Sequence, residues 1–295
     1  MNRLTRIAAA SIGIGVIVFG LKLWAWWITG SVALYSDAVE SIVNVVAATA
    51  ALYAVQLAQK PADSEHPYGH HKAEYFAAVL EGALILAAAF AIFSVAYRAY
   101  LAGASISAPW QGLAVNLLAA AINASWCWVL MREGKRNRSP ALLADGRHLL
   151  TDVVSSLGVM VGLAAAYSTG IAWLDPLLAC LVAVNILWSG MRLIRESVGG
   201  LMDEAVHPKL MASIKAAIAD GGDGAIEAHD LRTRVAGSAT FIDFHLVVPA
   251  SMTVGTSHAI CDRIESTIRQ EIEEAIITIH VEPQEKAKHK GVLVI

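Results

Sequence analysis

Two polar side chains, His148 and Asp152, stand four residues apart at the start of a strongly apolar run. The chain has 10 histidines, and His148 is the only one inside an apolar span. On a helix with about 3.6 residues per turn, this spacing puts both side chains on one face. A charged group at the centre of a bilayer costs roughly 2.5–3.5 kcal/mol, so it needs a partner or a function. The pair suits two ligands of one metal ion, or a helix entry where His148 is merely hydrogen-bonded.

A second polar stripe lies on an earlier apolar run. Asp37, Glu40 and Asn44 are three and four residues apart, so they also share one helix face. Opposite the first pair, Glu40 and Asn44 would complete a set of four nitrogen and oxygen ligands. Two carboxylates and a neutral imidazole would neutralise a divalent cation, and protons would compete with the metal for this site. The alternative is a structural polar contact between two packed helices.

Two further clusters of ligand-type residues lie in polar parts of the chain. The first is a Pro- and Gly-containing loop that could hold a metal or be solvated surface: Asp63, His66 and His70. The second lies in the C-terminal third: His229, His245, His258, His280 and Glu282. His245 and the His280/Glu282 pair occupy the polar faces of predicted strands, so they could converge on one side of a sheet. Imidazole and carboxylate suit zinc and its neighbours.

The composition indicates a helical membrane protein. Of 295 residues, 56% are hydrophobic and 16% charged, with a mean hydropathy of +0.55. Six apolar runs are long enough to cross about 30 Å of hydrocarbon: approximately Ile7–Ile28, Leu34–Leu57, Phe76–Tyr97, Leu113–Met131, Leu142–Tyr167 and Leu174–Leu193. The net charge of −3 argues against a nucleic-acid partner. The 3 lone cysteines support neither a disulfide framework nor a thiolate zinc site.

Basic residues predict the orientation. They gather in the loops after the second and fourth spans: Lys60, Lys72, Arg132, Lys135, Arg136 and Arg138. The positive-inside rule therefore puts both termini in the cytoplasm. We expect a multi-pass protein of the bacterial cell inner (plasma) membrane. Arg3 and Arg6 resemble the start of a secretory signal, but no cleavage site follows, so we expect a retained first span.

The pattern changes near residue 200. A helix, two strands, a helix and a strand are predicted at His207–Ala219, Glu227–Val235, Thr240–Val248, Thr256–Glu274 and Ile276–Glu282. This αββαβ order predicts a small ferredoxin-like α+β domain. We therefore expect a six-helix transmembrane domain at 1–200, a cytoplasmic metal-binding domain at 201–284, and a flexible tail at 285–295.

Several stretches together resemble the cation diffusion facilitators: SVALYSDAVESIVN, HPYGHHKAEYF, HLLTDVVSS, HDLRTRVAG and a terminal IHVEP. The resemblance runs from about Ile7 to Pro283. It implies a homodimer in the lipid bilayer that exports divalent transition metals from the cytoplasm with protons as the counter-ion. Such a protein is a secondary active transporter, without catalytic residues or an organic cofactor. Divalent metal is both its transported and its regulatory ligand.

The resemblance also assigns residues. The transport site falls on Glu40, Asn44, His148 and Asp152, the loop site on Asp63, His66 and His70, and the dimer-interface site on His229, His245, His258, His280 and Glu282. A charge interlock falls on Lys72 and Asp203. Zinc-selective members commonly have His or Asp where Glu40 stands and Asp where Asn44 stands. The neutral Asn44 therefore leaves zinc, iron, cobalt, cadmium, nickel and manganese open, with Asp37 as an auxiliary acid.

Three other classes of protein fit the sequence less well than a transporter. A membrane-anchored metal sensor or binding protein that does not transport would explain the soluble cluster equally well, but not polar groups buried in a bilayer. An intramembrane hydrolase would need a nucleophile with a base, or an HExxH motif, and the sequence has neither. A passive channel would need a continuous polar pore, and the third and fourth spans offer only Glu81, Asn116 and Asn123.

Overall fold

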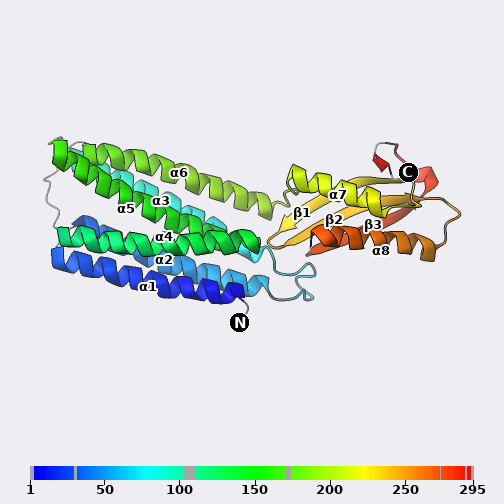
Figure 1. Ribbon diagram of the computed structural model, residues 1–295, viewed down its shortest axis with the longest axis horizontal. Coiled ribbons are helices and arrows are strands. Elements are labelled where there is room, and N and C mark those ends of the chain that lie inside the picture. The colour runs from blue at the N-terminus through cyan, green and yellow to red at the C-terminus, as the bar shows by residue number, and fades with distance from the viewer. Residues whose placement is uncertain are drawn as a thin grey trace. The chain divides into compact units, whose positions relative to one another are not determined.

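The computed structural model describes residues 3–29, 32–102, 110–169, 174–272, 274–289 and 291–293. The chain separates into two compact units, Met1–Val198 and Gly199–Ile295. Their boundary lies next to the one expected at residue 200. Figure 1 shows the first unit as a set of long helices and the second as helices beside a sheet.

Long helices build the first unit: α1 (Arg3–Thr29), α2 (Val32–Ala58), α3 (Ala73–Ala102), α4 (Trp110–Arg136), α5 (Pro140–Thr169) and α6 (Leu174–Leu201). Four described stretches qualify as membrane spans by length and hydropathy: Arg3–Trp27, Ser41–Ala58, Ala73–Arg98 and Ala114–Arg136. Helices α5 and α6 do not qualify over their described parts, where charged residues gather: Asp145, Arg147, Asp152, Arg192, Arg195 and Glu196. Six spans therefore stay a prediction.

Small side chains line the contacts between these helices. On α2, Ala47, Ala48 and Ala51 are all buried, and this helix packs against α1, α3 and α5. Small residues let helix backbones approach closely. Large apolar side chains instead point away from the bundle, such as Tyr53 and Phe90, which are 68% and 63% exposed. Small residues inside and large apolar residues outside are the arrangement expected of helices surrounded by lipid.

The second unit contains α7 (Pro208–Gly221), β1 (Glu227–Ala236), β2 (Ala239–Val248), α8 (Val254–Glu271), β3 (Ala275–Pro283), the short 3-10 helix η1 (Gln284–Lys286) and β4 (Val292–Leu293). The predicted αββαβ order is confirmed. The strands form one sheet in the order β3-β2-β1-β4. Strands β1 and β2 are antiparallel, whereas β2 and β3 are parallel and therefore need the crossover that α8 supplies.

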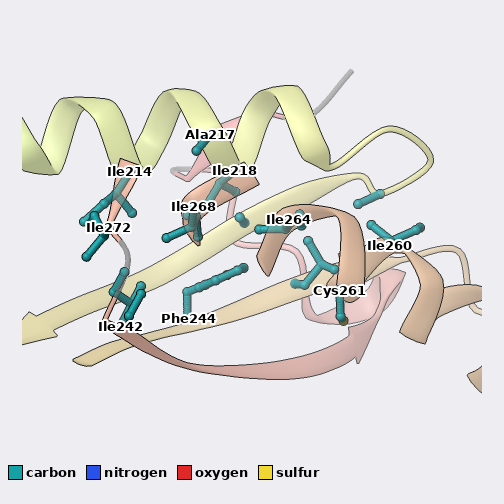
Figure 2. Packing of buried hydrophobic residues seen from close by; sticks show 14 of the residues in the cluster. Ile214, Ala217, Ile218, Ile242, Phe244, Ile260, Cys261, Ile264, Ile268 and Ile272 are labelled. Carbon is teal, nitrogen blue, oxygen red and sulfur yellow. The ribbon is translucent and has the colours of Figure 1, made fainter. Parts of the chain in front are cut away.

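One face of this sheet carries the core of the unit. Because side chains alternate along a strand, β2 turns Ile242, Phe244, Leu246 and Val248 toward the helices. Figure 2 shows Ile242 and Phe244 lying beneath the isoleucines of α8. The predicted buried stripe is Ile260, Ile264 and Ile268 of α8, with Ile272 at its C-cap. Ile214 and Ile218 of α7 complete the cluster. The other face of the sheet carries polar side chains of β2 as well as the buried Phe241.

The expectation of a flexible tail at 285–295 is wrong for part of that segment. Gln284–Lys286 form η1, and Val292–Leu293 pair with Glu227 and Ala228 of β1 as a short antiparallel strand. The backbone N–H of His289 also donates to the buried carboxylate of Glu227 over 2.9 Å. A two-residue strand carries no detectable alternation, so its pairing with a sheet edge cannot be recognised in the sequence.

Candidate functional site: a buried metal-ligand set and a histidine row

The predicted partners on α2 and α5 meet inside the first unit. Asn44 Nδ2 donates a hydrogen bond to Asp152 Oδ2. Asn44 Oδ1 lies 2.5 Å from His148 Nε2, and that nitrogen lies 4.0 Å from Asp152 Oδ1. Asn44, His148 and Asp152 are 5%, 2% and 3% exposed, so bulk water does not solvate them. Oxygen and nitrogen donors at this separation suit a divalent transition metal.

The remaining residues assigned to this site lie partly outside the described structure. Helix α2 includes Asp37 and Glu40, but neither side chain is among the described residues. Glu40 precedes Asn44 by one helical turn, so the two positions lie on the same face of α2. Their role in the site stays a prediction.

Further polar groups are buried near this set. Glu81 of α3 is 2% exposed, and its Oε1 lies 3.1 Å from His148 Nδ1. Asp145 of α5 is 3% exposed, one turn before His148, and Ser11 of α1 hydrogen-bonds to its carboxyl. Lys22 of α1 is 1% exposed. Sequence reasoning treated Glu81 only as an isolated polar residue and did not consider Lys22. An ionisable residue within an apolar run was the available signal.

The loop between α2 and α3 brings its predicted ligands together. Asp63 Oδ1 lies 3.3 Å from His66 Nδ1, and Asp63 Oδ2 lies 3.5 Å from His70 Nε2. Their ligand atoms fall within 4.8 Å of one another, as a shared metal ion requires. The backbone N–H of His66 donates to Asp63 Oδ1 over 2.7 Å and lowers the pKa of that carboxyl, which favours its ionised, metal-binding form.

Register gathers histidines of the second unit into a row. His229 of β1 pairs with His245 of β2, which pairs with His280 of β3. The ring centroids are 5.3 Å and 4.9 Å apart along this row. All three belong to the sheet face opposite the core formed by Ile242 and Phe244. The register thus places His245 and His280 side by side, as the polar faces of their strands predict, and adds His229 to them.

The carboxylate of Glu282 contacts all three histidines of the row. Its Oε2 lies 3.3 Å from His229 Nε2, and its Oε1 lies 3.2 Å from His245 Nδ1 and 3.7 Å from His280 Nε2. A carboxylate that reaches three imidazoles can neutralise and bridge metal ions bound there. His258 lies elsewhere, on α8, where it is exposed and 3.7 Å from Asp262. Within one chain, the structure therefore assembles this predicted set without His258.

A β-bulge brings a further carboxylate to the row. The β1–β2 register shifts between His229 and Arg232, and Asp230 takes a left-handed backbone conformation with φ 51°. Ligand atoms of His229, Asp230 and His245 lie within 4.8 Å of one another. Lys288 Nζ lies 2.5 Å from Asp230 Oδ2 and lowers the pKa of that carboxyl. Sequence reasoning missed Asp230, because without the bulge its side chain would point to the opposite face.

The residues of the expected charge interlock belong to different units. Lys72 directly precedes α3, whereas Asp203 follows α6 and accepts a hydrogen bond from Arg234 of β1 over 3.1 Å. Asp203 thus already has a basic partner within its own unit. The interlock between Lys72 and Asp203 stays a prediction.

Two family models match the chain. The cation efflux transmembrane domain matches residues 8–202, and the cytoplasmic domain of cation efflux proteins matches residues 206–284. The chain therefore belongs to the cation efflux family, the cation diffusion facilitators that its motifs resemble. Members of this family are membrane transporters and not enzymes.

Individual relatives cover nearly the whole chain. A Synechocystis sp. protein described as an uncharacterized transporter is 45% identical over 281 residues, covering 95% of this chain and 91% of the relative. The cation-efflux pump FieF of Pectobacterium atrosepticum is 32% identical over 286 residues, covering 95% of this chain and 93% of the pump. A solved structure of CzrB in its Zn form is 39% identical, covering 29% of this chain and 98% of that chain, with a TM-score of 0.28.

Proposed function

We propose that this protein exports a divalent transition metal from the cytoplasm in exchange for protons. The observation that carries the proposal is the buried meeting of Asn44, His148 and Asp152 between α2 and α5. A purely structural polar contact would not need an imidazole and a carboxylate at this depth, since each is costly to bury. Family membership supports cation efflux, and the geometry supports this position for the cargo.

Metal and protons would compete for the same atoms. In the metal-free chain, a proton between His148 Nε2 and Asn44 Oδ1 would satisfy both buried atoms. A metal ion entering from the cytoplasm needs the lone pair of Nε2 and both Asp152 and Glu40 ionised, so it displaces protons. Rocking of the helices would then expose the site outward, where returning protons release the metal.

The charge of the set favours a divalent cargo without fixing its identity. Two carboxylates, from Glu40 and Asp152, would balance the two positive charges, while Asn44 offers a neutral amide oxygen. An oxygen-rich site with one imidazole is harder than a site with two histidines, so we propose a cargo among zinc, iron, cobalt, nickel, manganese and cadmium. Asp37 would serve as an auxiliary acid.

The histidine row would be a regulatory metal site of a homodimer. His258 is exposed and lies outside the row of its own chain, so a second copy would supply it across the interface. Metal bound there would join the two copies and favour the inward-open state as cytoplasmic metal rises. The match to a cytoplasmic-domain model named for dimerisation supports this assignment. The loop site at Asp63, His66 and His70 would bind cytoplasmic metal near the entrance.

The membrane topology of the proposal has both termini in the cytoplasm of a bacterial inner membrane. Basic loop residues support it, as do Arg132 and Lys135 near the end of α4. Six spans would bring both termini to the same side. The Lys72–Asp203 interlock would then form at the cytoplasmic surface.

The experiment is metal uptake into proteoliposomes that contain a metal-sensitive dye and have an imposed proton gradient. The wild-type chain should drive uptake that collapses when the gradient is dissipated, and Asp152→Ala should abolish it. Glu133→Gln is a matched control, because Glu133 is another buried acid of the first unit but pairs with Arg3 over 2.7 Å. Full uptake by Asp152→Ala would refute the site. Metal binding by the full chain without any uptake would support a non-transporting sensor instead.

A further inference from the structure

Glu81 is a buried carboxylate that faces His148. It sits in α3, a helix apolar enough to span a membrane, and only 2% of its surface is exposed. A carboxylate at such a position is expensive and marks a functional contact. Its Oε1 lies 3.1 Å from His148 Nδ1. Among the described residues, neither of these two atoms has a hydrogen-bond partner, so each is available to the other.

The two nitrogens of His148 face different helices. Nδ1 faces Glu81 of α3, whereas Nε2 faces Asn44 of α2 at 2.5 Å and Asp152 at 4.0 Å. The ring nitrogens of an imidazole point in divergent directions, so Glu81 stands behind the ring as seen from the ligand set. It is therefore not placed to bind the same ion that Nε2 would bind.

We infer that Glu81 is a positioning residue for His148. By accepting a hydrogen from Nδ1, Glu81 holds the tautomer in which loss of the Nε2 proton leaves the lone pair of that nitrogen free for the metal. Such carboxylate–histidine pairs orient metal ligands and increase their basicity. The inference rests on the proposed function of His148 as a ligand of the transported metal.

The charge of Glu81 also bears on the neutral Asn44. When ionised, Glu81 would increase electron density on Nε2 and add negative potential beside the site. This contribution offsets the weak donor strength of an amide oxygen at Asn44. Glu81 is thus a determinant of metal affinity that does not touch the metal.

The second unit repeats the arrangement independently. Glu227 of β1 is 1% exposed, and its Oε1 lies 3.4 Å from His229 Nδ1. His229 Nε2 faces the candidate site, 3.3 Å from Glu282 Oε2. In both units a buried glutamate therefore stands at Nδ1 of a histidine whose Nε2 faces other ligand atoms. The recurrence supports a positioning role over an incidental ion pair.

The test uses the purified full-length chain with Co²⁺ as the probe. Asp63→Ala and His245→Ala form the background, which weakens the loop and cytoplasmic sites. In this background, Glu81→Gln and Glu81→Leu are compared with Asp152→Ala and with the control Glu133→Gln. Co²⁺ affinity and the visible ligand-field spectrum are recorded, because a residue that only stabilises the fold would leave the spectrum unchanged.

Glu81→Gln should weaken Co²⁺ binding about 10-fold and Glu81→Leu about 100-fold, the range found for carboxylate partners of metal ligands. Glutamine keeps an oxygen acceptor for Nδ1–H but loses the charge, so its effect should be smaller and its spectrum shifted. Glu133→Gln should match the background. If the leucine variant fails to fold, the nearly isosteric glutamine variant carries the test.

Background affinity and an unchanged spectrum in both Glu81 variants would overturn the inference, even if Asp152→Ala abolished binding. If Asp152→Ala itself bound Co²⁺ as tightly as the background, the proposed transport site would fail instead. The two failures are therefore distinguishable in one set of titrations.

Discussion

The buried set on α2 and α5 and the histidine row of the sheet use similar ligand types in opposite ways. In the first unit, Asn44 contacts both His148 and Asp152, so the polar side chains of this closed set satisfy one another. In the second unit, side chains of the row stay in part accessible, with His245 at 31% and His280 at 67% exposed. A site in lipid must satisfy its polar groups internally, whereas a site at a water-facing sheet can leave its ligands open.

The closed set suits metal–proton exchange, whereas the open row suits metal sensing. A closed set must break its own hydrogen bonds to admit metal, which fits the proposed coupling of metal binding to proton release and helix movement. An open row can bind metal with little rearrangement of its strands, because register already places His229, His245 and His280 side by side. The proposed function therefore assigns transport to the first unit and regulation to the second.

The largest effect should come from Asp152→Asn, which tests whether transport depends on the buried set. The change keeps the shape of the side chain but removes the anionic ligand, so metal flux in proteoliposomes should fall at least about 100-fold. Thermal stability without metal should stay equal or rise, since burying an amide is less costly than burying a carboxylate. A variant that kept its flux would place the cargo elsewhere.

His245→Ala should have the opposite profile. Loss of the middle histidine should weaken metal binding to the second unit more than about 10-fold, as measured by calorimetry on the full chain. The maximal flux should stay within about 3-fold of wild type, because the buried set is intact. A loss of flux as large as that of Asp152→Asn would show that the row belongs to the transport path.

Asn44→Asp should change the metal preference of the buried set, making it more like a zinc site. An additional anionic oxygen should raise the preference for Zn²⁺ over Mn²⁺ about 10-fold, or about 1.4 kcal/mol. Competition between the two ions in the flux assay measures this preference. An unchanged preference would mean that Asn44 does not contact the cargo.

The smallest effect should come from the ion pair between Asp230 and Lys288, beside the histidine row. Lys288 lowers the pKa of Asp230, so the stabilisation from this pair is present above the ordinary value of 3.8 and is lost as pH falls through the folded value below it. At neutral pH, Asp230→Asn should speed amide exchange at Val292 and Leu293 of β4, because the tail loses a contact with β1. Glu285→Gln, an exposed acid of the same tail, is the control.

Sequence periodicity predicted much of this architecture. Apolar runs gave the helices of the first unit, and alternation gave the strands whose polar faces carry His245 and His280. The spacing of His148 and Asp152 gave half of the buried set, because a shared helix face follows from local geometry alone.

What escaped prediction depends on contacts between elements distant in sequence. The pairing of Glu81 with His148 depends on which face α3 turns toward α5, and no single helix reports this. Asp230 joins the row only through a bulge, and β4 forms only because β1 offers a free edge. The side chains of Asp37 and Glu40 lie outside the described structure, so their part in the site rests on helix spacing.

The most direct test of the central claim measures metal and proton movement together. Proteoliposomes with no imposed pH gradient receive external metal, and an internal pH dye and a metal dye are read at once. Wild-type protein should move metal inward and protons outward with one time course, His245→Ala should keep both signals, and Asp152→Asn should lose both. Metal entry without proton movement, or equal signals from Asp152→Asn, would contradict exchange at the buried site.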